Sequence, residues 1–215
     1  MNAVPNIRIL LADDHEVVRA GYRRLLESTA DLAVVAEATC GEEAYSRFCE
    51  VHPDVAVMDL SMPGVGGLEA CRRMLAHAHD ARILVFSVHE NEVMLNRALE
   101  VGVLGYISKR SASQVMIEAV RRVAAGELYI GQEMLPHLLK RKPTADSELI
   151  AGLSAREFEV FRLLAESKSV NDIADLLSLS PKTVGHHATS VKGKLGISDL
   201  AGLTRLAIRL GMITP

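Results

Sequence analysis

Five residues with reactive side chains stand close after apolar segments of this sequence. They are the carboxylates Asp13, Asp14 and Asp59, the hydroxyl of Ser87 and the ammonium of Lys109. Three carboxylates brought together repel one another and need a positive partner, and Mg2+ suits a site that offers a few oxygen ligands. With Mg2+ and Lys109 to balance the charge, Asp59 is suited to attack phosphorus and form an acyl phosphate. Ser87 is then placed to hydrogen-bond a phosphoryl oxygen.

These side chains meet only if the apolar segments form one sheet. The segments are near-continuous apolar runs at Ile7–Ala12, Leu32–Ala36, Val55–Met58, Ile83–Phe86 and Val103–Ile107. Such runs are typical of strands buried on both faces of a parallel sheet, and helical periodicity fills the stretches between them. We therefore predict a doubly wound α/β domain with a five-stranded parallel sheet. The carboxyl ends of its strands share one edge, where ligands bind.

Three regions follow from the pattern along the chain: a first domain over residues 1–128, a linker over 129–150 and a second domain over 151–215. The linker contains Pro136 and the run Lys140-Arg141-Lys142-Pro143, which predicts a short helix and then a flexible connection. The second domain is predicted to be all-helical with four helices. Ser154 and Glu157 form a capping box, and Ser180-Pro181 begins another helix.

Charge is divided unevenly between the two halves. Residues 1–139 hold 13 basic against 19 acidic residues, a net −6, whereas residues 140–215 hold 11 against 8, a net +3. An acidic first part and a basic second part fit phosphate or metal chemistry followed by nucleic-acid binding. Scatter of surface charge would give the same balance, so this signal is weak alone.

Composition excludes several classes of protein. Of the 215 residues, 49% are hydrophobic and 24% charged, which argues against disorder. No apolar run approaches the ~20 residues that span a bilayer. The start, MNAVPNIRILLADD, does not resemble a secretory signal. Cys40, Cys49 and Cys71 have no metal-binding spacing and are interpreted as thiols in a reducing cytosol, so we expect a cytoplasmic protein without a membrane partner.

Four motifs at the strand ends resemble the receiver domain of two-component response regulators, a flavodoxin-like fold: DDH, VMDLSMPGVGGLEA, FSV and GYISK. The resemblance covers residues ~5–125. It implies that Asp59 is the phosphoacceptor, and that Mg2+ is held by Asp13, Asp14, Asp59 and the backbone carbonyl of Ser61. It also implies that Ser87 and Tyr106 form a switch and that Lys109 contacts the phosphoryl group. Arg110 stands where many receivers have proline, so the resemblance does not predict the conformation of the loop after the fifth strand.

His15 follows the acidic pair directly. It is a candidate metal ligand or base, but we interpret it first as a residue of the first helical turn. His77 and His79 stand near a predicted helix end, and we interpret them as interacting with the helix dipole rather than binding a metal.

The segment SLSPKTVGHHATSVKGKLGI predicts a helix with an apolar face at Val184, Ala188, Val191 and Leu195 and a small, polar opposite face. Together with LSAREFEVFRLLAE and NDIADLLSLSPKTVGHH, it resembles the LuxR-type helix-turn-helix of NarL/FixJ response regulators over residues 152–213. We expect its DNA contacts from Lys182, Thr183, His186, Thr189 and Lys192. Basic residues common in that family are missing at Asn171, Gly185 and Leu200, which predicts weak binding by one copy and a need for dimerisation.

The sequence therefore predicts a DNA-binding transcriptional regulator that a partner histidine kinase phosphorylates and that binds double-stranded promoter DNA as a homodimer. It is not expected to be a turnover enzyme. One alternative is a phosphatase with an aspartyl nucleophile, although Ser61 stands where such enzymes have a second aspartate. Another is an interaction module with weak DNA binding. The last helix, over Asp199–Leu210, supplies either a dimer contact or core through Leu203, Leu206, Ala207 and Leu210.

Overall fold

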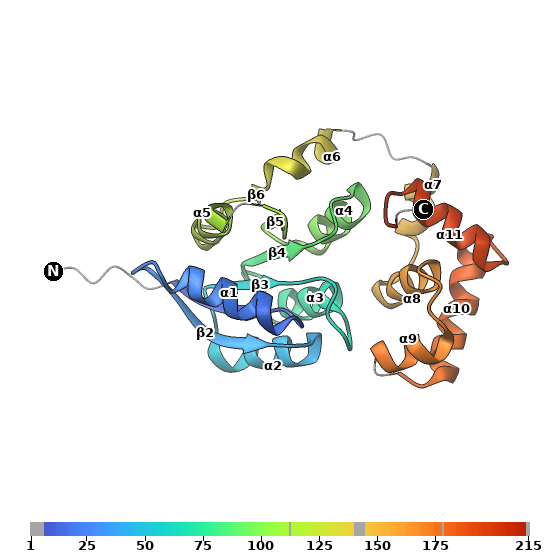
Figure 1. The fold of residues 1–215 in the computed structure, drawn as a ribbon, viewed down its shortest axis with the longest axis horizontal. Helices are drawn as coiled ribbons and strands as arrows, with labels where there is room; N and C mark the ends of the chain where they lie inside the picture. The colour runs from blue at the N-terminus through green and yellow to red at the C-terminus, as the bar shows by residue number, and fades with distance from the viewer. Residues whose placement is uncertain (1–6, 112, 140–144, 178, 214–215) are drawn as a thin grey trace.

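The computed structural model describes residues 7–111, 113–139, 145–177 and 179–213. Its first domain is built on a parallel sheet with strand order β2-β1-β3-β4-β5-β6 (Figure 1). The strands are β1 (Ile7–Ala12), β2 (Leu32–Ala38), β3 (Val55–Met58), β4 (Ile83–Ser87), β5 (Gly105–Ser108) and β6 (Tyr129–Ile130). The prediction of a doubly wound parallel α/β domain is confirmed.

The sheet differs from the prediction at the β5 edge. β5 begins at Gly105 rather than at Val103, and it is preceded by the buried Val103 and the half-buried Leu104. A sixth strand, β6, pairs in parallel with β5 and lies within the segment predicted as linker. The Tyr129 amide donates to the Leu104 carbonyl at 2.9 Å, and the Gly131 amide donates to the Tyr106 carbonyl at 2.9 Å. A two-residue strand is too short to produce a periodic signal in sequence.

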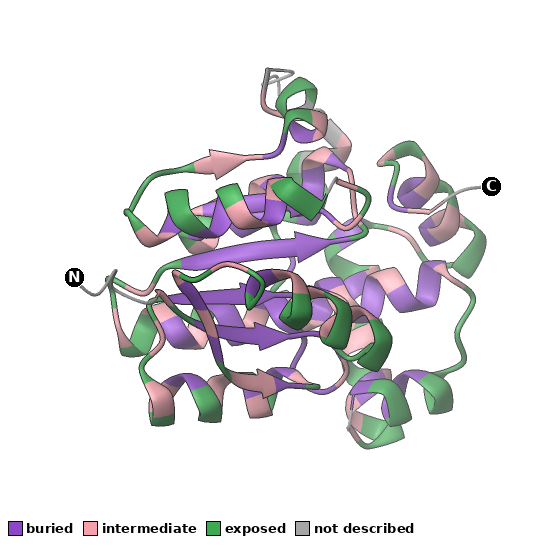
Figure 2. Ribbon diagram, turned by 60° about the vertical axis from the view of Figure 1, so that its left-hand side comes forward, coloured by how far each residue is buried: buried purple, intermediate pink, exposed green. Residues whose placement is uncertain are grey.

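Five helices cover the two faces of the sheet: α1 (Glu16–Leu26), α2 (Gly41–Val51), α3 (Gly67–His77), α4 (Glu92–Val101) and α5 (Ser113–Ala124). In β1, Ile9 and Leu11 pack with residues of α1 and α5, whereas Leu10 and Ala12 pack with residues of α2, α3 and α4. Figure 2 shows the central strands buried along their length and the helices buried on one side. This two-sided burial explains why the strands are near-continuous apolar runs.

The remaining elements are helical. They are η1 (Gln132–Met134), α6 (Leu135–Leu139), α7 (Ala145–Ala151), α8 (Ala155–Ala165), α9 (Val170–Leu177), α10 (Pro181–Leu195) and α11 (Leu200–Arg209). The capping box of Ser154 and Glu157 is present, and Pro181 stands in the first turn of α10 after the Ser180 cap, as predicted. The predicted flexible connection at Lys140-Arg141-Lys142-Pro143 lies outside the described residues.

The structure shows whether the apolar residues of the last helix, α11, form core or an exposed dimer contact. Leu203, Leu206 and Ala207 are all fully buried in the core, and Leu210 packs against it. These residues are therefore core, and a dimer contact through α11 would need its other face. Within the described part of the chain, no helix combines the length and apolar composition that crossing a membrane requires.

The two domains are in contact. Apolar side chains of the loop after β3 and of α4 form one cluster with those of α8 and α9, including Leu60, Met94, Phe158 and Leu177. The Gly64 amide donates to the Leu176 carbonyl at 3.1 Å. The second domain therefore covers part of the surface of the first domain beside the carboxyl edge of the sheet.

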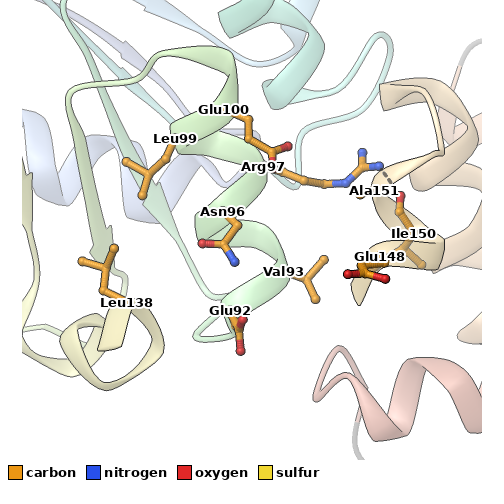
Figure 3. Close-up of a pocket in the computed structure, with 10 residues that line it drawn as sticks. All are labelled: Glu92, Val93, Asn96, Arg97, Leu99, Glu100, Leu138, Glu148, Ile150 and Ala151. Atoms are coloured by element: carbon orange, nitrogen blue, oxygen red, sulfur yellow. Dashed lines mark hydrogen bonds between the residues drawn. The ribbon is translucent and has the colours of Figure 1, made fainter. Parts of the chain in front are cut away.

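Arg97 of α4 forms a buried polar link across this junction. The residue is 8% exposed, and its guanidinium donates to the carbonyls of Ile150 at 2.6 Å and Leu153 at 2.7 Å. It also lies 4.1 Å from the centroid of the Phe158 ring. Figure 3 shows Arg97 reaching from α4 toward Ile150 beside a pocket of about 570 Å³, lined also by the carboxylates of Glu92, Glu100 and Glu148. Bonds to a charged donor are about twice as strong as neutral ones.

Glu159 of α8 lies against the loop after β3. Its side chain is 13% exposed and 2.9 Å from the Arg156 guanidinium, which also donates to the Gly64 carbonyl at 2.6 Å. Gly66 has a φ of +73°, and a Cβ there would lie 1.3 Å from Glu159 Oε1. A side chain at this position would displace the Glu159 carboxyl group, and the positive φ also favours glycine. Burial raises the pKa of Glu159 to about 8, against the opposite effects of Arg156 and Arg162.

Candidate functional site

Two buried carboxylates and one lysine meet at the carboxyl edge of the sheet. Lys109 Nζ lies 2.6 Å from Asp13 Oδ2 and 2.7 Å from Asp59 Oδ2, and both aspartates are 1% exposed. Strand pairing fixes them, because the Asp59 amide donates to the Ala12 carbonyl at 2.9 Å and the Lys109 amide to the Ser87 carbonyl at 2.8 Å. The predicted convergence of these strand ends is present in the structure.

The site carries an excess of negative charge. Burial raises the pKa of Asp59 more than Lys109 and the Ser61 amide lower it. Burial lowers the pKa of Lys109, but the attraction of Asp59 and Asp13 outweighs it and leaves the pKa raised. Asp14 lies exposed at the rim. One ammonium faces three carboxylates, so the site can accept a further cation.

Four residues offer donor atoms for that cation: Asp13, Asp14, His15 and Asp59. One donor atom from each lies within 4.8 Å of all the others. This cluster could hold a metal ion, and its oxygen-rich composition is typical of sites for hard divalent cations.

The loop after β3 is held close to Asp59. The Ser61 amide donates to Asp59 Oδ1 at 3.1 Å. A Cβ at Gly67 would lie 1.9 Å from the Asp59 carbonyl oxygen, so the start of α3 can approach only without a side chain there. These contacts orient the Asp59 carboxylate toward Lys109.

Ser87 and Tyr106 lie on adjacent strands and are both completely buried. The Tyr106 hydroxyl donates to the His89 carbonyl at 2.7 Å, and the Ser87 hydroxyl accepts from the His89 amide at 3.2 Å. The side chain of Tyr106 is therefore held inside the protein beside the loop after β4.

Sequence reasoning missed His89. Its Nε2 lies 3.1 Å from Ser61 Oγ, which ties the loop after β4 to the loop after β3. Burial, with Arg162 and Lys109 nearby, lowers the pKa of His89 to about 4, so the ring is neutral at pH 7. The available signal was its place two residues after Ser87, at the same sheet edge as Asp59.

The helix α10 presents its predicted faces. Val184, Val191 and Leu195 are buried, and Ala188 packs against the core. On the other side, Lys182, His186 and Thr189 are exposed, while Thr183 and Lys192 are half-buried.

Some of these polar groups already have partners within the domain. Thr183 Oγ1 lies 2.8 Å from Ser180 Oγ, and the Thr189 hydroxyl donates to the Gly185 carbonyl at 2.9 Å. Lys194, which the prediction left out, lies 2.6 Å from Glu157 Oε2.

Comparison with known families agrees with the two-domain architecture. Residues 9–121 match the response regulator receiver domain, and residues 151–207 match the luxR family of bacterial regulatory proteins. The chain is 39% identical over 209 residues to the response regulator UvrY of Escherichia coli, covering 96% of this chain and 95% of that protein.

Solved structures of the response regulator RcsB resemble nearly the whole chain. One is RcsB of Salmonella enterica serovar Typhimurium bound to a promoter in the presence of phosphomimetic BeF3−, with 27% identity, a TM-score of 0.68, and coverage of 94% of this chain and 98% of that one. Another contains two RcsB dimers on two parallel DNAs, with 28% identity, a TM-score of 0.61, and coverage of 97% and 100%.

Proposed function

Because this chain belongs to the LuxR-type, DNA-binding response regulators of two-component systems, we propose that phosphorylation of Asp59 by a partner histidine kinase controls its binding to promoter DNA. The observation that carries this proposal is the buried set of Asp13, Asp59 and Lys109 at the carboxyl edge of the sheet. The proposed regions are a receiver over residues 1–128, a linker over 129–150 and a DNA-binding domain over 151–215.

Asp59 acts as the nucleophile in this proposal. A carboxylate oxygen of Asp59 attacks phosphorus of a phosphohistidine, the P–N bond breaks, and the imidazole leaves as the O–P bond forms. Lys109, 2.7 Å from Asp59 Oδ2, neutralises charge on the transferred oxygens. The Ser87 hydroxyl, at the end of β4, donates a hydrogen bond to one of these oxygens. The phosphoryl group stays bound to Asp59 and no product is released, so we do not propose that the protein is a turnover enzyme.

The donor atoms fit Mg2+. Asp13, Asp14 and Asp59 supply carboxylate oxygens, the proposed fourth ligand is the Ser61 carbonyl, and the raised pKa of Asp59 reflects a buried charge that one ammonium does not fully balance. When bound, the ion supplies positive charge next to the transferred phosphoryl oxygens. Asp13 and Asp14 hold and orient it, and Ser61 keeps the Asp59 carboxylate in place.

The exposed face of α10 is the proposed DNA surface. Lys182 and Lys192 contact phosphates, and His186, Thr183 and Thr189 lie where base edges would meet the helix. Phosphorylation is proposed to favour a homodimer on double-stranded promoter DNA, supported by the dimers of the RcsB structure. A cytoplasmic location follows from this proposed role.

A labelling experiment tests the proposal. Incubation with acetyl phosphate and Mg2+ is expected to add about 80 Da, one phosphoryl group. Asp59→Asn is expected to remove this gain, and Asp14→Ala to lose the dependence on the cation together with most of the labelling. Labelling of Asp59→Asn at another residue of the cluster would overturn the assignment.

A second arm tests the coupling of phosphorylation to DNA binding. Ser87→Ala is expected to accept the label but to change DNA affinity less than the wild type does on labelling. Sedimentation with and without the phosphodonor, on DNA and off it, measures the dimer. One protomer per DNA site after full labelling would end the dimer model.

A further inference from the structure

His15 turns its ring into the acidic cluster although it begins a helix. It is the N-cap residue of α1, yet its side chain makes no capping hydrogen bond. Instead Nδ1 lies 2.8 Å from Asp14 Oδ1 and 3.5 Å from Asp13 Oδ1. The His15 amide donates to Asp13 Oδ1 at 2.9 Å, which holds the backbone of this residue beside the site. Sequence reasoning treated His15 first as an ordinary residue of the first turn.

The spacing of these donor atoms suits one metal ion. Two neighbouring ligands of an octahedral ion at 2.0–2.1 Å from the metal lie about 3 Å apart, a separation that follows from the right angle between them. The 2.8 Å between His15 Nδ1 and Asp14 Oδ1 is close to this value. The side chain of His15 is 65% exposed, so the ring can adjust its position without disturbing the core.

The chemistry of the donor set also matters. A nitrogen ligand does little for Mg2+, which prefers oxygen, whereas imidazole suits first-row transition metals. Asp13, Asp14, Asp59 and His15 together offer three carboxylates and one imidazole, with one donor atom each mutually within 4.8 Å. Such a set accepts Mg2+ through its oxygens and Mn2+ or its heavier neighbours through oxygens and nitrogen.

We propose that His15 is a metal ligand that gives the phosphoacceptor site a preference for first-row transition cations such as Mn2+ over Mg2+. The inference rests on the proposed cation site of the receiver and adds its selectivity. Under this proposal the imidazole takes part only when the bound ion accepts nitrogen, and the carboxylates serve both kinds of ion.

Cation binding to the full-length, unphosphorylated protein tests this proposal. Titrations with Mn2+ followed by electron paramagnetic resonance, and with Mg2+ in competition, give both dissociation constants. His15→Ala is expected to raise the Mn2+ constant about tenfold or more, by the scale of effects at metal sites, and to leave the Mg2+ constant within about twofold. His79→Ala, which removes an exposed histidine in the turn after α3, is the matched control and is expected to change neither constant.

A second readout reports the nitrogen directly. Spin-echo modulation from bound Mn2+ is expected to show one coordinated nitrogen in the wild type and in His79→Ala, and none in His15→Ala. Asp14→Ala is expected to weaken the binding of both cations.

The outcomes separate the two proposals. If His15→Ala binds Mn2+ as tightly as the wild type, or if the substitution weakens the binding of Mn2+ and Mg2+ equally, the proposed role of His15 is wrong and the carboxylate site stands. If the wild type binds neither cation, the proposed cation site fails and the selectivity fails with it.

Discussion

Docking of the two domains is expected to weaken as the pH rises through 8, because Glu159 must lose its proton inside the domain junction. The pKa of this carboxyl is about 8, against an ordinary value of 4.5. Burial is the largest cause, and Glu69 of α3 adds to it, whereas Arg156 and Arg162 on its own helix act in the opposite direction. Separation of the domains exposes Glu159 and returns its pKa toward the ordinary value.

The sign and size follow from proton linkage. A raised pKa means that the docked arrangement holds a proton that the separated one releases between pH 4.5 and pH 8. This contribution to docking is complete below the lower value and is lost as the pH rises through 8. One pKa unit corresponds to about 1.4 kcal/mol. Raising the pH from 7 to 9 therefore makes the free energy of docking less favourable by about 1.4 kcal/mol, which lowers the docking equilibrium constant about tenfold.

Small-angle X-ray scattering and sedimentation velocity measure this change. The wild type is expected to expand between pH 7 and pH 9. Glu159→Gln keeps the shape of the side chain without its charge, so it is expected to stay compact at both values. Glu118→Gln, at an exposed position of α5, is the matched control and should expand as the wild type does.

Two results would refute this reasoning. A wild type that is equally compact at pH 7 and pH 9 contradicts a proton held at the junction. Equal expansion of Glu159→Gln and wild type assigns the pH dependence to another group.

Three further predictions follow from contacts described above. Arg97→Ala removes two charge-assisted hydrogen bonds and a cation–π contact, so scattering at pH 7 is expected to show at least tenfold weaker docking; an unchanged profile would contradict the role of Arg97. Lys182→Ala and Lys192→Ala are each expected to weaken binding to all DNA sequences and to lower the slope of log affinity against log salt by about 0.9, as expected for one lost phosphate contact, whereas Arg24→Ala on the receiver serves as the charge-matched control. His186→Ala is expected to change the sequence selected from random DNA; an unchanged selection would place base recognition elsewhere.

Local signals in the sequence predicted much of this structure. The bounds of β1 and β3 were predicted to the residue, because each is an apolar run that ends at a polar residue. The caps at Ser154 and Ser180 were also predicted, because a capping hydrogen bond joins residues only three positions apart. The convergence of Asp13, Asp59 and Lys109 followed from the topology of a parallel sheet.

Contacts between distant segments were harder to predict. β6 pairs with β5 over two residues and has no periodicity of its own. The partners of His89 include Ser61, 28 positions away, and Glu159 is buried against Gly66, 93 positions away. Such environments depend on the packing of whole elements, and no spacing rule in sequence describes them. The order of the two domains was clear from the sequence, but their docking surface was not.

The helix α8 separates two surfaces that serve different purposes. It packs against α3 on one side and against α10 and α11 on another, so it lies between the receiver and the exposed residues of α10 (Figure 1). Substitutions at Lys182, His186 or Thr189 therefore fall away from the contacts of Arg97 and Glu159. In evolutionary terms, duplicated copies of this gene can change the exposed face of α10 while the contacts of the domain junction are inherited unchanged.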